Sequence, residues 1–428
     1  MSTIIRSGSA NTYDASLRNI LLRQADLATL QSELTSGKKI VQASDDPTGA
    51  ANAERAMTRI NRIASDQRAL ASQRDTIAQA ESTLGNVTDA LQSFRDLVVS
   101  AGNGANTDAD RKTIAMQLQG LRDQVMTLAN TKDTNGLPLF GALGSALAPF
   151  VGPQATAPDY TFKGLPGQVA SSNVGIPSSL DGDSAFMLQP GRDAAYNVQT
   201  TAAASTSRLY PLSVSGVTVT DKTALTSDTY TIKINNVTLG TTPNTGIATY
   251  TITGSPSGYS ATNTTGEFSY NLPISIPVPD PSQAGQVGAP GLSLSLNGDV
   301  RIGDTFTLQP EASVFSVLDT AIQNIGSAST STDATQAVDQ ALQNIDISME
   351  RISAARGQAG DLLNRADRIS STQDQRSAQL QTDKSNAEDI DMASAISEFQ
   401  NKQTGYSAAL QSYAQIQKLS LFNYISIA

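Results

Sequence analysis

The chemical groups available to this chain are limited, because its 428 residues include no histidine and no cysteine. That composition excludes Ser-His-Asp and Cys-His nucleophiles and leaves carboxylates as the strong ligands for transition metals. Among the closely spaced carboxylates of the sequence, the pairs Asp45-Asp46 and Asp181-Gly-Asp183 are candidates for metal binding. The first precedes Pro47 and is typical of a helix N-terminus. The second resembles half of a Ca²⁺ loop but lacks a glutamate at the required spacing, which favours a tight turn.

Other catalytic motifs are missing from the sequence: no phosphate-binding glycine loop, zinc-ligand spacing or nucleophile motif is found. A pair of carboxylates in the β-rich middle of the chain could still perform glycoside hydrolysis. That possibility stays open as an alternative. We predict a protein that is not an enzyme and has no catalytic, cofactor-binding or metal-binding residues.

The charge balance narrows the range of partners. The formal net charge is −10, the isoelectric point is about 4.6, and no run of Lys or Arg is present. We therefore expect neither nucleic acid nor a membrane as a partner. No apolar run reaches the length of a membrane span, and residues 1–11 lack the hydrophobic core of a secretory signal. The protein either stays in the cytoplasm or leaves the cell without a cleaved leader.

The two ends of the chain carry apolar stripes of equal period. In each, one residue in three or four belongs to the stripe, the spacing of a coiled-coil contact line. The C-terminal stripe is Met392, Ile396, Phe399, Gln403, Tyr406, Leu410 and Tyr413; the N-terminal one is Tyr13, Leu17, Ile20, Gln24, Leu27, Gln31 and Leu34. We expect the two helices to pair antiparallel. We also expect assembly with other copies through an interface formed by Leu17, Ile20, Leu27, Leu34, Ile396, Phe399, Tyr406, Leu410 and Tyr413.

Longer helices are expected inside these two. Heptad spacing predicts one helix from Pro47 to about Ser100 and another that begins at Thr107 or Asp108. Helix returns at 314–325 and again from Val338. Within this last helix, Gly357 and Gly360 suggest close approach of a neighbouring backbone, with simple tolerance of glycine as the alternative. The polar stretch 370–386 is expected to link this helix to the last one.

The middle of the chain changes to Thr, Ser, Gly, Pro and Val, with the alternation typical of strands at 228–235, 248–253 and 266–271. Residues 182–190 and 303–310 resemble each other, which suggests similar strands on both sides of an inserted module, unless the likeness is chance. We predict an α+β multidomain fold: long antiparallel helical rods from both termini, with inserted β-rich outer domains. The expected divisions are 1–46 (assembly helix and loop), 47–143 and 314–378 (rod), 144–190 with 301–313 (β domain), 191–300 (inserted β module) and 379–428 (assembly helix).

Several segments resemble the flagellin superfamily. They are Leu-Thr-Ser-Gly-Lys-Lys-Ile at 34–40, Ser-Asp-Asp-Pro-Thr-Gly-Ala-Ala at 44–51, the stretch 128–141 with its Asn-Gly and Leu-Phe-Gly, residues Arg351, Arg356, Gly357, Gly360 and Asn364, and Ser-Asn-Ala-Glu-Asp-Ile-Asp at 385–391. Flagellin usually has a DDAAG form where this chain has DDPTG at 45–49, and hook and proximal junction proteins usually carry an SNNIAN-like run absent here. The chain is most similar to members at the distal junction of hook and filament. The resemblance spans about 1–141 and 303–428 and says nothing specific about 191–302.

The resemblance implies a structural component of the bacterial flagellum that joins hook to filament as a ring built through terminal helices. It further implies export without a cleaved signal peptide, a secreted, extracellular location, and three kinds of partner: copies of itself, the proximal hook-associated protein with flagellin, and a flagellar export chaperone. The alternatives are a flagellin-type filament subunit, a cytoplasmic coiled-coil scaffold, and a secreted β-domain enzyme or adhesin.

Overall fold

The computed structural model describes residues 9–154, 159–203, 208, 210–214, 217–219, 221–269, 274–276 and 291–425. It divides the chain into two compact units. Unit 1 comprises residues 1–68 and 370–428, and unit 2 comprises residues 69–369. The two longest helices, α2 (Pro47–Ala101) and α6 (Ser331–Glu388), contribute to both units.

The other helices are α1 (Ser9–Ser36), α3 (Asp108–Ala129), α4 (Gly182–Phe186), α5 (Val314–Ser327), α7 (Met392–Ile425) and a 3-10 turn at Lys222–Ala224. Their ends follow local capping chemistry. At the start of α3, the side chain of Thr107 accepts a hydrogen bond from the Asp110 amide. The Asp110 carboxylate accepts one from the Thr107 amide in return, and the two bonds form a capping box. At the end of α1, Gly37 adopts a φ of 69°, the left-handed conformation that the sequence predicted there.

Unit 2 has a helical part in which α2, α3, α5 and α6 enclose a continuous apolar core. This core includes a group of aromatic rings where the short hairpin of β1 (Phe150–Val151) and β2 (Thr161–Phe162) meets α4 and α5. The Phe186 and Phe315 rings stack with centroids 5.7 Å apart, and Phe150 contacts both. These rings anchor the segment between the helices onto the bundle.

The β part of unit 2 is built on a sheet of order β3-β12-β6-β7-β8, with β9 also on β7. The strands are β3 (Tyr196–Thr201), β6 (Thr229–Leu239), β7 (Thr245–Ser255), β8 (Ser260–Thr264), β9 (Phe268–Ser269) and β12 (Thr305–Pro310). A second sheet contains β4 (Ser213–Val214), β5 (Thr218–Val219), β10 (Ile274–Ile276) and β11 (Leu292–Asn297). Alternating residues of both sheets share one core, as the period-two pattern requires.

The predicted fold class is confirmed, since terminal helices frame a β-rich middle. The two similar segments 182–190 and 303–310 were expected to form similar strands. This expectation is wrong, because Gly182–Phe186 is helix α4 whereas 305–310 is strand β12. Strand β12 pairs with β3 and β6, which lie within the stretch predicted as an inserted module. Strand pairing therefore crosses the expected boundary at 300–301, and the domain divisions stay a prediction.

Two further expectations are corrected. Residues 370–386 form no link between helices, because α6 continues to Glu388; the stretch contains no Gly or Pro to end it, and Leu380 is buried. The expected boundary at 378–379 falls within this helix. Gly357 and Gly360 mark no close approach in the described structure, where a Cβ at either position would have no atom within 4 Å.

Candidate assembly surface of the terminal helices

The two terminal helices, α1 and α7, lie side by side in unit 1, as both views show. They are antiparallel, because the end of α1 adjoins the start of α7. The Ile390 amide donates a hydrogen bond of 3.1 Å to the Gly37 carbonyl, and the Lys39 amide donates one of 2.8 Å to the Glu388 carbonyl. The predicted antiparallel pairing of the two ends of the chain is confirmed.

An ion pair reinforces this connection. Lys38 Nζ lies 2.8 Å from Glu388 Oε1, and Lys384 adds a second contact at 3.5 Å. The hydrogen bond from Lys38 lowers the pKa of the Glu388 carboxyl, and the same bond raises the pKa of Lys38. These ion pairs thus link the segment that follows α1 to the end of α6, which precedes α7.

The connection on the N-terminal side is a loop organised by the two adjacent aspartates. Asp45 Oδ2 accepts hydrogen bonds from the amides of Val41 and Gln42, at 3.1 and 2.7 Å. Asp46 Oδ1 accepts from the amides of Thr48 and Gly49, at 3.1 and 2.9 Å, and so caps α2 as predicted. No group of three acidic residues suited to a metal ion occurs in the described part of the chain.

Glycine 49 is required by this loop for a steric reason. A Cβ there would come within 2.6 Å of Ile40 Cδ1 and within 2.5 Å of Asp46 Oδ2. Ile40 is itself buried, so the loop folds this apolar side chain over the first turn of α2, whereas its neighbour Val41 is exposed. The Asp-Asp-Pro-Thr-Gly sequence is therefore a compact turn that leads from α1 into α2.

The residues predicted as an assembly interface fall into two groups. Ile20 is buried, and Leu27, Leu34, Phe399, Tyr406 and Tyr413 are half-buried, so the α1–α7 contact itself uses them. The remaining three are exposed: Leu17, Ile396 and Leu410 expose 39, 46 and 41 % of their surface. Half-exposed apolar side chains of this kind remain available to other chains.

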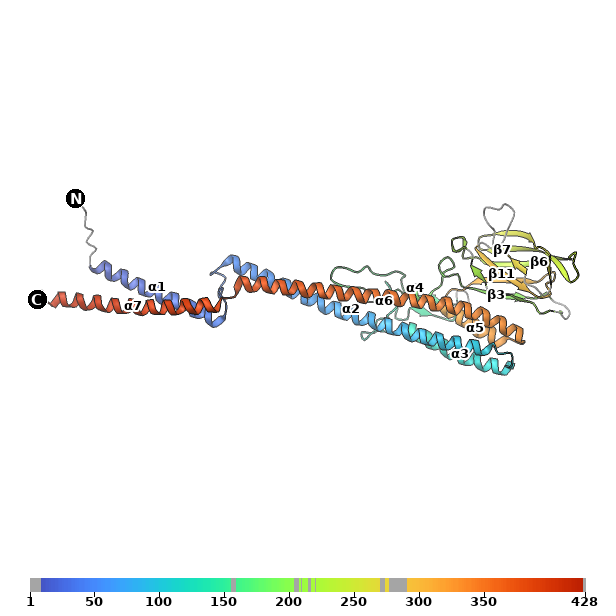
Figure 1. Cartoon of the computed structure of the whole chain (residues 1–428), viewed down its shortest axis with the longest axis horizontal. Coiled ribbons are helices and arrows are strands. Elements are labelled where there is room, and N and C mark those ends of the chain that lie inside the picture. Colours follow the sequence, from blue (N-terminus) through green and yellow to red (C-terminus); the bar gives the residue numbers. More distant parts are fainter. Residues whose placement is uncertain are drawn as a thin grey trace. The chain divides into compact units, whose positions relative to one another are not determined.

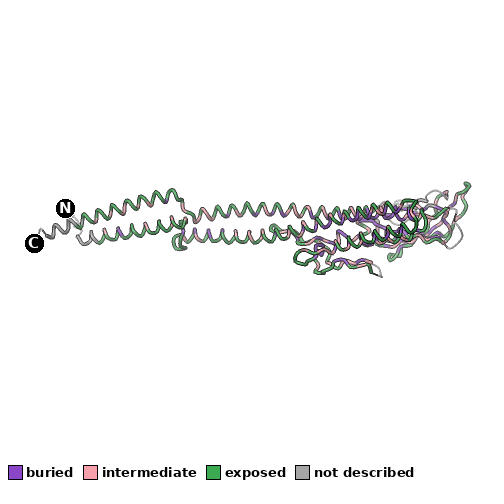
Figure 2. Tube along the Cα trace, turned by 90° about the horizontal axis from the view of Figure 1, so that it is seen from below, coloured by how far each residue is buried: buried purple, intermediate pink, exposed green. Residues whose placement is uncertain are grey.

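More apolar residues join the exposed group. Leu21, Leu22 and Met392 are also exposed on the same two helices. Figure 2 shows that exposed residues predominate along α1 and α7. Each helix of a two-helix pair can cover only one side of the other, so a broad apolar stripe is left partly in water. This exposed set, Leu17, Leu21, Leu22, Met392, Ile396 and Leu410, is called the outer stripe below.

Sequence reasoning missed residues on the inner side of the pair. Leu30 and Ala395 are both buried, whereas the expected stripe followed Gln31 and Ile396, which are exposed. On α7 the covered positions are Ala395, Phe399, Lys402, Gly405, Tyr406, Ala409 and Tyr413. A search for large apolar residues overlooks alanine and glycine, although small side chains permit the closest helix approach. The side chain of Tyr13 lies outside the described residues.

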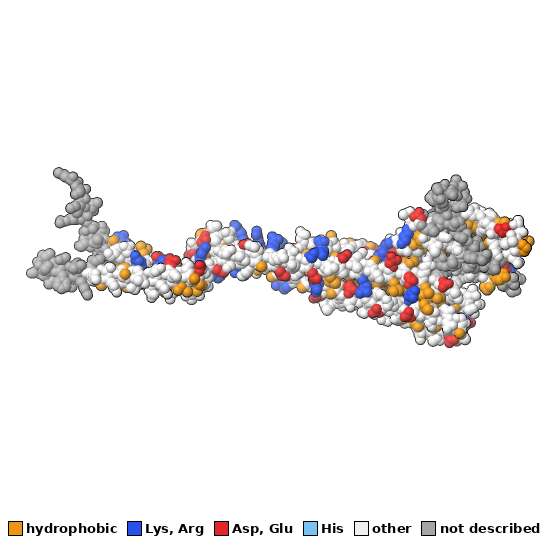
Figure 3. All heavy atoms as spheres, in the orientation of Figure 1, with side chains coloured by type: hydrophobic (Ala, Val, Ile, Leu, Met, Phe, Trp, Pro, Cys, Tyr) orange, Lys and Arg blue, Asp and Glu red, His pale blue; other side chains and the backbone are white. Residues whose placement is uncertain are grey.

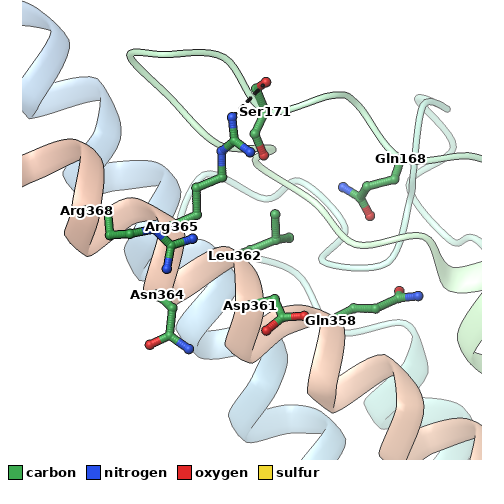
Figure 4. Close-up of a pocket in the computed structure, with 8 residues that line it drawn as sticks. All are labelled: Gln168, Ser171, Gln358, Asp361, Leu362, Asn364, Arg365 and Arg368. Atoms are coloured by element: carbon green, nitrogen blue, oxygen red, sulfur yellow. Dashed lines mark hydrogen bonds between the residues drawn. The ribbon is translucent and has the colours of Figure 1, made fainter.

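A recess of about 550 Å³ lies in unit 2 between α6 and the loop around residues 168–171. Figure 4 shows Arg365 pointing from α6 towards the loop, where its Nη2 donates to the Ser171 carbonyl at 3.5 Å. Its other polar lining residues are Gln168, Gln358, Asp361, Asn364 and Arg368. This arrangement holds the loop on the helix and supplies no nucleophile with an adjacent base.

The carboxylates of the second predicted pair are also structural. Asp181 caps α4 by accepting a hydrogen bond from the Asp183 amide, as the predicted turn requires. Burial and the neighbouring Asp181 raise the pKa of Asp183. A search of the described helices finds none with the length and hydropathy needed to cross a membrane.

Family models match both ends of the chain. The bacterial flagellin N-terminal helical region matches residues 9–143, and the bacterial flagellin C-terminal helical region matches residues 342–425. These ranges contain the whole of the α1–α7 pair. The outer stripe therefore lies within the matched regions.

Individual relatives agree with the family models. Flagellar hook-associated protein 3 of Salmonella typhimurium is 35 % identical over 149 residues, which cover 34 % of this chain and 46 % of that protein. The Escherichia coli protein of the same name matches over the same shares. The flagellar filament core protein flaB2 of Brachyspira hyodysenteriae is 34 % identical over 120 residues, 28 % of this chain and 42 % of that one. The chain thus spans just under half the length of these curated relatives.

Solved structures show the same fold. The flagellar junction protein FlgL from Legionella pneumophila superposes with a TM-score of 0.55 at 24 % identity, covering 73 % of this chain and 98 % of that one. FlgL from Xanthomonas campestris gives a TM-score of 0.55 at 20 % identity, over 77 % and 98 % of the two chains.

Proposed function

This chain belongs to the flagellin superfamily, and we propose that it is a structural subunit of the bacterial flagellum that joins the hook to the filament. Its copies assemble into a ring through the outer stripe of α1 and α7. The protein is exported without a cleaved signal peptide, with the help of an export chaperone. Its neighbours in the finished structure are the proximal hook-associated protein on one side and flagellin on the other.

The observation that carries this proposal is the exposed outer stripe. Its six apolar side chains lie on two helices that are otherwise covered only by each other. Six exposed large apolar side chains on one pair of helices are available for contact with other chains, and gathered exposed apolar surface marks contact sites. Burial against neighbours would contribute about 25 cal/mol for each Å² of apolar surface removed from water.

Heterologous contacts suit this surface. A ring requires that each copy bind its two neighbours through two different patches, so that contacts continue around the axis. The outer stripe has members on both α1 and α7, which lets one copy present two helices to its neighbours. A cytoplasmic scaffold, by contrast, would need its terminal helices to be covered within the monomer.

An enzymatic function finds less support. The chain has no His or Cys, and its described acidic residues form no cluster suited to a metal. The proteins it resembles are structural parts of the flagellum. A flagellin-type filament subunit remains the second candidate, because flaB2 also matches, at 34 % identity over a shorter stretch of 120 residues.

The test is Leu410→Asp in the full-length protein. Leu410 exposes 41 % of its surface in the free chain, so the substitution leaves the α1–α7 pair folded. In an assembled ring the carboxylate would be buried against an apolar neighbour, at a cost of several kcal/mol. Because 1.4 kcal/mol corresponds to a factor of ten, incorporation should fall by about a hundredfold or more. Immunogold labelling of isolated hooks and filaments measures how much of the variant is incorporated.

The matched control is Leu239→Asp, which places the same charge at a side chain 85 % exposed at the end of β6. This variant should assemble normally and support swimming. Label at the distal end of the hook supports the junction, whereas label along the filament supports a flagellin-type subunit. Normal incorporation of Leu410→Asp would show that the outer stripe is no assembly surface.

A further inference from the structure

The charges of this chain are unevenly divided between its two units. Unit 1 contains 13 basic and 13 acidic residues, whereas unit 2 contains 16 basic and 26 acidic residues. The whole net charge of −10 therefore belongs to unit 2. Within α2 the part in unit 1 has four arginines against two acidic residues, and the part in unit 2 has two arginines against four.

The arginines at the start of α2 form an exposed basic face, defined here as Arg55, Arg59 and Arg62. Figure 3 shows basic side chains gathered over this part of α2. Arg55 donates a 3.3 Å hydrogen bond to Asn52, and no ion pair of these three arginines occurs in the part of the chain described. Arg55 and Arg59 also line a recess of about 510 Å³ between α2 and α6.

The basic side chains of α2 in unit 2 are, by contrast, already paired with α6. Arg74 lies 3.1 Å from Asp367, and Arg95 lies 2.9 Å from Asp346. Across the same helix contact, Arg356 of α6 lies 2.7 Å from Glu81 of α2. These pairs use both arginines of this part of α2. Its remaining acidic residues form no ion pair within 4 Å in the part of the chain that the structure describes.

Three of these acidic residues form a second exposed face, the acidic line of Asp75, Asp89 and Asp96. Their spacings are multiples of seven, so in a helix with a heptad contact they fall on one side. That side is opposite to the buried residues Ile77, Leu84, Leu91 and Val98. No ion pair of the three aspartates is found among the residues described.

We propose that the basic face of one copy binds the acidic line of the next copy in the ring. The two faces have opposite charge, equal numbers of charged groups and different positions on one helix. A contact between them is heterologous. Each copy can therefore bind one neighbour through its basic face and the other neighbour through its acidic line, and the contact repeats from copy to copy. This inference rests on the proposed function, and adds the surface that sets which copies lie side by side.

A second copy fits the basic face better than a nucleic acid does. Three arginines in a unit of zero net charge, within a chain of net charge −10, give little long-range attraction for a polyanion. Against a line of three carboxylates, the same arginines form several pairs at once. Complementary charges of this kind select the correct register, because like charges in a wrong register repel.

The test uses three full-length variants in cells that lack the wild-type copy. The first carries Arg55→Glu, Arg59→Glu and Arg62→Glu, and the second carries Asp75→Arg, Asp89→Arg and Asp96→Arg. Each places like charges at every contact and should reduce the copies per hook by about tenfold or more. The third carries all six substitutions and should assemble with itself, because the complementarity is restored with the signs exchanged.

The control reverses two exposed acidic residues of α6, Asp339→Arg and Glu350→Arg, and should assemble normally. Normal assembly of both single-face variants, or failure of the six-fold variant in spite of a normal circular dichroism spectrum, would overturn the charge pairing. Wild-type protein, supplied to the same cells in place of a variant, should be located at the hook, and this result would support the junction function whatever the variants do. Wild-type protein absent from the flagellum would instead refute the proposed function itself.

Discussion

A buried carboxyl in unit 2, that of Glu311, gives a quantitative test of the structure. Glu311 follows β12 and is buried, and its amide donates a 2.9 Å hydrogen bond to the Ala195 carbonyl. Its Oε1 atom has no hydrogen-bond partner. Burial, with smaller contributions from the nearby carboxylates of Asp159 and Asp319, raises the pKa of Glu311 from 4.5 to about 7, against a hydrogen bond from Thr320 that lowers it.

The raised pKa makes the stability of unit 2 depend on pH. Between pH 4.5 and 7 the folded protein retains a proton that the unfolded chain has released, so stability falls as the pH rises through this window. Above pH 7 the loss is complete and amounts to about 3 kcal/mol. The other charges nearby are Asp159, Asp319 and Arg122, and Arg122 Nε lies 2.9 Å from Asp319 Oδ1.

Glu311→Gln removes the charge while it keeps the shape of the side chain. Its buried amide retains an unpartnered polar atom, which costs about 1–3 kcal/mol. The variant should therefore gain about 0–2 kcal/mol over wild type at pH 8, because the cost of the amide offsets part of the gain from removing the charge, and gain nothing at pH 4. Urea unfolding followed by near-ultraviolet circular dichroism measures this, since the buried residues Tyr160, Tyr196 and Tyr230 all report on unit 2.

Glu350→Gln is the control, because Glu350 is exposed on α6 and its neutralisation should leave the urea midpoint nearly unchanged. If the stability of wild type were flat between pH 4.5 and 7, or if Glu311→Gln lost stability at pH 8, the carboxyl would have to be hydrated or paired. The structural account of its burial would then be wrong.

Two further predictions concern the helices. Gly357→Ala should raise the stability of unit 2 by about 1 kcal/mol, because a Cβ there has no atom within 4 Å and alanine is the better helix former; a lower urea midpoint would show that the glycine is needed. In dilute monomer, amides near Leu410 should exchange with solvent faster than those near the fully buried Ile345, because few covered side chains hold the α1–α7 pair. Equal protection at both sites would favour the scaffold alternative.

The helices were accessible to sequence reasoning because their signals are local and repeated. Seven-residue spacing predicted α2. The start expected at Thr107 or Asp108 and the end expected at Gly37 agree with the structure, in which Thr107 caps α3 and Gly37 follows α1. The β region was less accessible. The residues at 182–186 and 303–310 share a pattern, but their different neighbours make one a helix and the other a strand.

The sequence by itself determined that the two ends of the chain are amphipathic helices and that the chain lacks the usual catalytic side chains. It also determined the flagellin resemblance, which depends on short motifs at fixed positions. Only the tertiary structure decided which apolar residues face the partner helix. Ile20 and Leu30 turn inward while Leu17 and Leu410 stay exposed.

The physical reason is that periodicity fixes a stripe on a helix but not the direction from which it is covered. Small residues such as Ala395 decide how closely two helices approach, and they give almost no signal in a hydrophobic pattern. Charges behave in the same way. Arg74 and Arg55 look alike in the sequence. Only the tertiary structure shows that Arg74 is paired with Asp367, whereas Arg55 is exposed and forms no ion pair among the described residues.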